Sequence, residues 1–191
     1  MEEVTLHNMP QSTGWIEVIC GCMYSGKTEE LIRRLRRAQI AKQKVTIFKP
    51  RVDNRYSTSQ IVSHSEQSLA SVVVDNPHEI RQLASTAQVI GIDEAQFFSP
   101  DLINICEELA NQGRRVIIAG LDQDYRGIPF GPMPHLLAVA EYITKTLAIC
   151  MVCGNPADRT QRITASHELV LVGAKGVYEA RCRKCFVPPN D

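Results

Sequence analysis

Eight residues at positions 21–28 have the types and the spacing needed to hold a phosphate group. They follow the pattern G-x-x-x-x-G-K-[ST], in which glycines let the backbone curl so that successive N–H groups point at phosphate oxygens. Lys27 would reach the β- and γ-phosphates as a point charge, and the Thr28 hydroxyl would be a Mg²⁺ ligand. A chance match is the alternative, and an apolar strand before the run and a helix after it argue against chance. This phosphate loop consists of Gly21, Cys22, Met23, Tyr24, Ser25, Gly26, Lys27 and Thr28.

Two acidic residues follow a short apolar run. Val89–Ile92 is fully apolar, and Asp93 comes directly after it. An aspartate at the end of such a strand is the usual partner of a phosphate loop, so Asp93 would hold Mg²⁺, directly or through water, together with Thr28. Glu94 could take a proton from an attacking hydroxyl or water, or it could be only a helix N-terminal acid stabilised by the dipole. The predicted nucleotide-binding segment comprises Asp93, Glu94, Ala95 and Gln96.

Four of the seven cysteines form two C-x-x-C pairs, Cys150 with Cys153 and Cys182 with Cys185. Each turn can place two thiolates on one ion, and two turns complete a tetrahedral Zn²⁺ site that leaves no position open for substrate. We therefore expect a structural zinc. The 28 residues between the pairs exceed the usual zinc-ribbon spacing, which predicts a loop tied at its base. Redox disulfides are the alternative, although a redox motif has one such pair near a βαβ unit.

Alternating strands and helices must position these residues. The expected strands are 15–20, 45–48, 72–74, 89–92 and 116–120, with a β-prone stretch at 143–149. The expected helices are 28–40, one starting at Pro77 after the cap Asn76, one from Ser99 to about residue 111, and 135–142. This alternation predicts an α/β fold with a parallel sheet covered on both faces. Ligands bind beyond the strand C-termini of such sheets, where the phosphate loop, Asp53, Asp93, Glu94 and the 121–131 loop should converge.

Several local expectations follow from residue type. Pro50 should end the second strand, and the polar residues 51–68 should form a loop. Ile80, Leu83 and Ala84 should share the apolar face of their helix.

Other side chains have structural interpretations. Glu29 and Glu30 precede Arg33 and Arg34 by four positions, which is typical of a solvated, salt-bridged helix face, with a nucleic-acid or phosphate patch as the alternative.

The apolar cysteines and phenylalanines fall in predicted core segments. Cys20 and Cys106 should be core thiols, and Cys22 should lie near the ligand. Phe97 and Phe98 are either core or pocket wall.

Bulk composition narrows the function classes. The chain has 191 residues, with 21 basic and 21 acidic side chains and a net charge of zero, which argues against a general polyanion binder. No run approaches 18 apolar residues, and the N-terminus lacks the features of a signal peptide. We expect a cytoplasmic protein without nucleic-acid or membrane partners. The expected units are a flexible segment 1–14, a nucleotide-binding domain 15–148 and a zinc-binding domain 149–191.

Five motifs occur in an order and spacing that resemble one family. They are G-x-M-Y-S-G-K-T from Gly21, D-x-R-Y from Asp53, D-E-A-Q-F-F from Asp93, G-L-D-x-x-Y-x-x-x-P-F from Gly120, and the two cysteine pairs. Together they resemble the zinc-containing thymidine kinases of the cellular and bacterial type, and we expect a bacterial member. The resemblance covers nearly everything from residue 16 to residue 185.

The resemblance implies a function. It implies transfer of the γ-phosphoryl of ATP to the 5′-hydroxyl of thymidine or deoxyuridine, in pyrimidine salvage, with Mg²⁺ and a structural Zn²⁺. It also implies a recombinase-like P-loop sheet with a small zinc-bound lasso domain, a homotetramer, and feedback inhibition by thymidine triphosphate.

The resemblance also implies residue roles. Glu94 matches the catalytic base, Arg55 the cation near the transferred phosphoryl, and Asp53 a polar group of the active site. The nucleoside site would comprise Met23, Phe97, Leu121, Tyr125, Phe130, Leu169, Val170, Leu171, Val172, Gly173 and Tyr178, of which 169–173 and Tyr178 match the lasso that covers thymidine.

Two other functions compete with this one. An ATPase or helicase-like motor would use Asp93 and Glu94 to activate water, but it usually needs a second lobe. The second competing function is a zinc-ribbon module that binds nucleic acid, and the zero net charge of the chain argues against it.

Overall fold

The structure is a computed structural model that describes residues 13–51, 60–62, 68–164 and 176–189. Asp53, Arg55 and the predicted lasso residues 169–173 lie outside the described residues. In the described ranges, no helix has both the length and the apolar character needed to cross a membrane.

Six parallel strands form the central sheet, in the order β5-β2-β6-β7-β1-β8. Runs of β-branched residues favour this arrangement, because a parallel sheet covered on both faces buries both sides of each strand. All four residues of β6 are buried, as are five of the six in β7. The strands are β1 (Trp15–Cys20), β2 (Val45–Pro50), β5 (Val72–Val74), β6 (Val89–Ile92), β7 (Arg115–Gly120) and β8 (Tyr142–Lys145).

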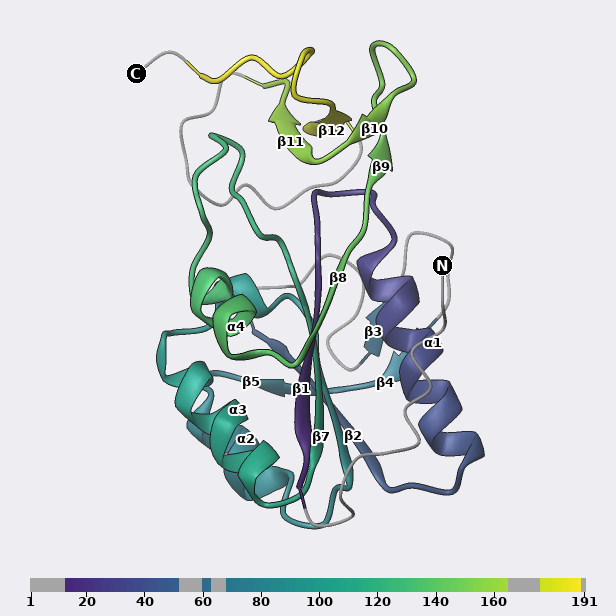
Figure 1. Ribbon diagram of the computed structural model, residues 1–191, viewed down its shortest axis with the longest axis vertical. Helices are drawn as coiled ribbons and strands as arrows, with labels where there is room; N and C mark the ends of the chain where they lie inside the picture. The colour runs from purple at the N-terminus through teal and green to yellow at the C-terminus, as the bar shows by residue number, and fades with distance from the viewer. Residues whose placement is uncertain (1–12, 52–59, 63–67, 165–175, 190–191) are drawn as a thin grey trace.

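Helices cover both faces of the sheet, which confirms the predicted fold class (Figure 1). Helix α1 (Lys27–Ile40) lies on one face. Helices α2 (His78–Leu83), α3 (Asp101–Asn111) and α4 (Met133–Val139) lie on the other. Strand β7 shows how the two cores are divided: Val116 and Ile118 pack with α2, α3 and α4, whereas Ile117 and Ala119 pack with α1. Cys106 and Cys20 are buried in the first core, as predicted.

One local prediction about the first half of the sheet is confirmed, and one is wrong. Strand β2 ends at Pro50, as predicted, and Pro50 pairs with Val74 of β5. It lies beyond the last residue of β2 that pairs with β6, so its missing N–H interrupts no hydrogen bond to that neighbour. Leu83 is 51% exposed, because α2 ends there and the chain turns so that Ala84 and Ala87 are buried instead.

The predicted loop 51–68 and the helix 135–142 also differ from the structure. The described part of the first segment contains an antiparallel pair, β3 (Gln60–Val62) and β4 (Ser68–Ala70). The second helix runs from Met133 to Val139, and Tyr142 begins β8 instead. Pairing with β1 overrides the helical pattern there, because the N–H of Glu141 already donates to the carbonyl of Ile16.

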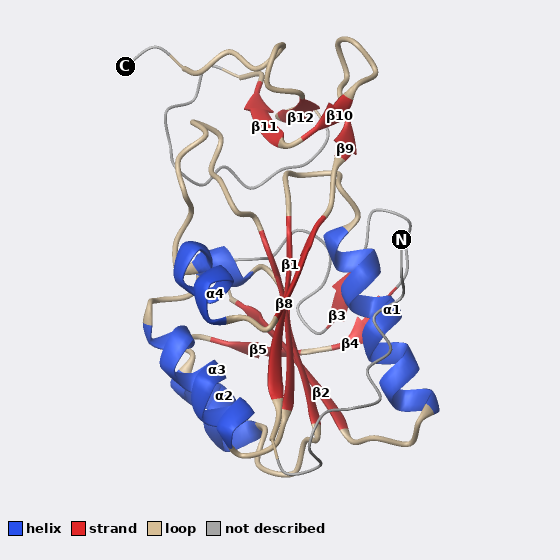
Figure 2. Cartoon of the chain, viewed as in Figure 1, coloured by secondary structure: helices blue, strands red, loops and turns tan. Residues whose placement is uncertain are grey.

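A small C-terminal unit, described here as residues 148–164 and 176–189, lies beyond the carboxyl edge of the sheet (Figure 2). Two antiparallel pairs form it, β9 with β10 and β11 with β12. Its strands are β9 (Ala148–Ile149), β10 (Pro156–Ala157), β11 (Arg159–Arg162) and β12 (Tyr178–Arg181).

Candidate active site

The phosphate loop has the conformation that its glycines permit. Gly21 has a φ of 145°, and Gly26 has a φ of 85°, both in the left-handed half of conformational space. A Cβ on Gly21 would lie 2.3 Å from the carbonyl oxygen of Thr146, so a side chain at this position would collide with backbone. The loop therefore turns tightly from the end of β1 into α1. Its N–H groups lie at the N-terminus of α1, where the positive end of the helix dipole favours an anion.

Thr146, the residue after β8, holds this turn through hydrogen bonds. The N–H of Thr146 donates to the carbonyl of Cys20 at 2.8 Å, and its hydroxyl lies 2.8 Å from the hydroxyl of Ser25. Ser25 in turn donates to the carbonyl of Cys22 at 2.8 Å. These bonds fix the loop before any ligand arrives.

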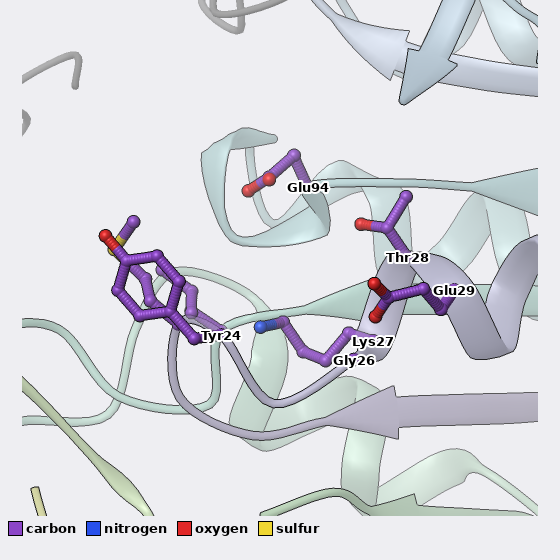
Figure 3. Close-up of a pocket in the computed structure, with 8 residues that line it drawn as sticks. Tyr24, Gly26, Lys27, Thr28, Glu29 and Glu94 are labelled. Carbon is purple, nitrogen blue, oxygen red and sulfur yellow. The ribbon is translucent and has the colours of Figure 1, made fainter. Parts of the chain in front are cut away.

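Lys27 and Thr28 begin α1 and face the candidate phosphate site (Figure 3). The ammonium of Lys27 donates to the carbonyl of Cys22 at 2.7 Å. Burial lowers the pKa of Lys27, and the carboxylate of Glu94 is the neighbouring charge that opposes this most. The Thr28 hydroxyl lies 3.2 Å from one carboxylate oxygen of Asp93, as expected of two side chains that could share one hard cation.

Glu94 has an unusual backbone conformation, and its side chain lines the same pocket as Lys27 and Thr28. Its φ is 52°, and such left-handed conformations in residues other than glycine cluster at functional sites. Gln96 donates to the carboxylate of Glu94 at 2.5 Å and accepts from the N–H of Leu121 at 2.9 Å. The helix that follows is the three-residue 3₁₀ helix η1 (Ala95–Phe97), too short for the dipole role that we considered for Glu94.

One pocket joins the phosphate loop to the ends of β6 and β7. In Figure 3 the polar ends of Lys27, Thr28 and Glu94 point into the same space, and the ring of Tyr24 borders it. The described lining residues are Met23, Tyr24, Gly26, Lys27, Thr28, Glu29, Glu94 and Leu121. The predicted convergence at the carboxyl edge of the sheet is therefore confirmed for the phosphate loop, Glu94 and the start of the 121–131 loop.

The aromatic residues predicted to form the nucleoside wall lie on three elements. The rings of Phe97 and Phe130 meet edge to face with centroids 5.6 Å apart, which joins η1 to the 121–131 loop. Phe98 was expected to be either core or pocket wall, and the structure places it in the core. Tyr125 and Tyr178 meet through a third side chain, Arg162, described below.

Not all predicted nucleotide-binding side chains reach the pocket. Ala95 is fully buried in the core with α2, α3 and α4. Cys22 is buried against the C-terminal unit, and its thiol donates to the carbonyl of Ala157 at 3.3 Å. Any contact of Cys22 with a ligand would therefore use its backbone. Burial raises the pKa of the Cys22 thiol, and burial together with the nearby Asp122 raises that of Cys20 to about 11, so both are poor nucleophiles.

Sequence reasoning missed two residues of the C-terminal unit that contact the site. Thr160 accepts a hydrogen bond from the N–H of Met23 in the phosphate loop at 3.0 Å. Arg162 is buried between two aromatic rings. Neither residue belongs to a spaced motif, and both lie on β11, whose position over the phosphate loop depends on the fold of the whole unit.

The four motif cysteines converge as predicted. Their sulfur atoms all lie within 4.8 Å of one another. The sulfurs of Cys153 and Cys182 are 3.6 Å apart, too far for a disulfide bond. Tetrahedral zinc with Zn–S bonds of about 2.3 Å requires sulfur separations of roughly 3.8 Å, so these residues fit a Cys₄ zinc site.

Comparison with known proteins agrees with this geometry. Residues 14–186 match the profile of the family described as "Thymidine kinase". The chain is 61% identical over 179 residues to a thymidine kinase of Rhodothermus sp. (strain ITI 518), a match that covers 94% of this chain and 84% of the relative.

Two solved structures show a looser likeness. One is the genome packaging NTPase B204 of Sulfolobus turreted icosahedral virus 2 in complex with ATP-gammaS, with 20% identity, 69% and 74% coverage of the two chains and a TM-score of 0.44. The other is the Legionella pneumophila ATPase DotB, with 17% identity, 78% and 44% coverage and a TM-score of 0.46. The profile and the 61% identity establish that the chain belongs to the thymidine kinase family.

Proposed function

We propose that this protein transfers the γ-phosphoryl of ATP to the 5′-hydroxyl of thymidine, giving thymidine monophosphate and ADP. The observation that carries the proposal is one pocket that contains Lys27 of the phosphate loop and the carboxylate of Glu94, in a chain of the thymidine kinase family. A phosphoryl donor site and a proton acceptor in one pocket are what transfer to a hydroxyl requires.

The residues around the phosphate loop would bind and orient ATP. Loop N–H groups and Lys27 would contact the β- and γ-phosphates, and Lys27 would exchange its bond to the Cys22 carbonyl for a phosphate oxygen. Thr28 and Asp93 would hold Mg²⁺, which supplies charge neutralisation on the phosphates when bound. Glu94, oriented by Gln96, would accept the proton of the nucleoside hydroxyl.

The nucleoside would lie next to the γ-phosphate, beside Met23 and Leu121 of the pocket. Phe97, Phe130, Tyr125 and Tyr178 would form its aromatic wall. By the family resemblance, residues 169–173 would cover the base, Arg55 would lie near the transferred phosphoryl, and Asp53 would be a polar group of the site.

Other features remain part of this proposal. Zn²⁺ on Cys150, Cys153, Cys182 and Cys185 would be structural, because four thiolates leave no open position. We further propose deoxyuridine as a second acceptor, feedback inhibition by thymidine triphosphate, a homotetramer, and a boundary between the two folded units near residue 148.

A panel of nucleosides incubated with ATP and Mg²⁺ tests the function, with monophosphate and ADP both quantified. We expect thymidine monophosphate and ADP in equal amounts from the unchanged protein, and both products to form roughly 10²-fold more slowly, or slower still, with Lys27→Ala. ADP release that does not depend on nucleoside would favour the ATPase alternative. A salt-dependent affinity for DNA without nucleoside phosphorylation would favour the nucleic-acid module.

A further inference from the structure

Arg162, the last residue of β11, is a buried arginine outside every motif in the sequence. Only 7% of its surface is exposed. A guanidinium removed from water is costly unless it is well paired, so a buried arginine indicates specific partners. Among the described residues, two contacts of Arg162 come from segments distant in sequence.

The guanidinium lies between two tyrosine rings. Its central carbon is 3.6 Å from the ring centroid of Tyr125, which is close contact with the face of the ring. One nitrogen donates to the hydroxyl of Tyr178 at 2.6 Å, and the Tyr178 ring centroid is 5.2 Å away. Tyr125 belongs to the loop after β7, and Tyr178 begins β12. One side chain therefore ties the loop of the sheet to the C-terminal unit.

The same chain of contacts reaches the phosphate loop. The carbonyl of Tyr178 accepts a hydrogen bond from the hydroxyl of Tyr24 at 3.1 Å. Tyr24 lines the pocket together with Lys27 and Glu94. The backbone of Tyr178 is thus bonded to the phosphate loop, and Arg162 binds the hydroxyl at the far end of the Tyr178 side chain.

We propose that Arg162 is a positioning residue for nucleoside binding, which holds Tyr125 and Tyr178 in place as two sides of the aromatic wall before the nucleoside arrives. The inference rests on the proposed function, because that function makes these rings part of the nucleoside site. Rings that are already ordered cost less entropy to bind against, so the effect falls on nucleoside affinity. Arginine suits this role because its planar guanidinium can stack on one ring and donate in its plane to another group, which a lysine ammonium cannot do.

The test compares Arg162→Met, Arg162→Lys and Tyr178→Phe with the unchanged protein, by thymidine KM, ATP KM, kcat and melting temperature. A hydrogen bond to a charged group and a stacked cation together predict a rise of about tenfold or more in thymidine KM for Arg162→Met. We expect a smaller rise for Arg162→Lys, and less than about a threefold change in kcat and ATP KM. Arg37→Met, which changes an exposed arginine of α1, is the control and should change none of these values.

The double variant Arg162→Met/Tyr178→Phe separates positioning from general loosening. If Arg162 acts through the Tyr178 hydroxyl, the two effects on thymidine KM will combine to less than their product. A folded Arg162→Met protein with unchanged thymidine KM would overturn the inference while leaving the proposed function intact. If that variant does not fold, Tyr178→Phe decides, and an unchanged thymidine KM there would overturn it equally. An unchanged protein that does not phosphorylate thymidine would refute both.

Discussion

Replacing Glu94 by glutamine is the sharpest test of the proposed chemistry. The change keeps the size of the side chain and removes its ability to take a proton. The structure indicates that its position would survive, because the carbonyl oxygen of glutamine can still accept the hydrogen bond from Gln96. The nearby Lys27, Thr28 and Asp93 are unaltered, so the phosphate contacts remain.

General-base assistance is typically worth about 10²–10⁴-fold in rate, which corresponds to roughly 3–5 kcal/mol of transition-state stabilisation. We therefore expect Glu94→Gln to lower kcat by about that factor. One secondary effect has a known direction. Glu94 is the charge that most supports protonated Lys27, so its loss lowers the pKa of Lys27 further. The loop N–H groups, Thr28 and Asp93 are unaltered, so ATP affinity should change little.

The assay measures kcat and the KM of ATP and thymidine across a series of Mg²⁺ concentrations, with Asp93→Asn as the matched comparison. Asp93→Asn should weaken the productive ATP complex and recover in part at high Mg²⁺, because its carboxylate faces the Thr28 hydroxyl. Glu94→Gln should not recover. Full rescue of Glu94→Gln by excess Mg²⁺ would show that Glu94 serves the metal, and a loss of less than tenfold would show that it is not the base.

Three further predictions concern the loop, the metal and the sheet. Lys27→Ala should lower turnover by roughly 10²–10³-fold or more with the melting temperature preserved; wild-type turnover in this variant would contradict the phosphate-loop assignment. Elemental analysis should find about one zinc per chain, and its removal by a chelator should destabilise the C-terminal unit and weaken thymidine binding more than it affects the sheet; unchanged melting and thymidine affinity would refute the structural role. Burial acts to raise the pKa of Glu17, but hydrogen bonds and charges from Arg115, Trp15 and Arg34 together lower it below its ordinary value. Ionised Glu17 therefore stabilises the fold above about pH 4.5, and this stabilisation is lost as the pH falls through the folded-state pKa. Glu17→Gln should cost about 3 kcal/mol in urea unfolding at pH 7 and less in acid, and an equal cost at both would contradict the ionic role.

Local patterns predicted the parts of this protein whose chemistry depends on spacing along the chain. The phosphate loop is one such part, because its contacts come from consecutive backbone N–H groups and from a lysine and a threonine next to them. The cysteine pairs are another, since one turn of chain brings each pair of sulfurs together. Hydrophobic periodicity located the strands and helices of the sheet for the same reason: the period is a property of neighbours in sequence.

Patterns failed where a neighbour distant in sequence decided the outcome. The helical spacing runs on to Tyr142, yet α4 ends at Val139 and Tyr142 pairs with Glu17 of β1 as the first residue of β8. The side chain of Cys22 turns away from the pocket because the C-terminal unit packs over it.

The sequence by itself therefore determined the phosphate-loop motif, the cysteine pairs and the alternation that makes a parallel sheet. Only the tertiary structure decided which charges are buried. Glu17 is ionised inside the fold because Arg34 and Arg115, 17 and 98 positions away, converge on it. Arg162 is buried because Tyr125 and Tyr178, on separate elements, close around it. The free energy of burying a charge depends on the partners that surround it in space, and spacing along the chain carries no record of those partners.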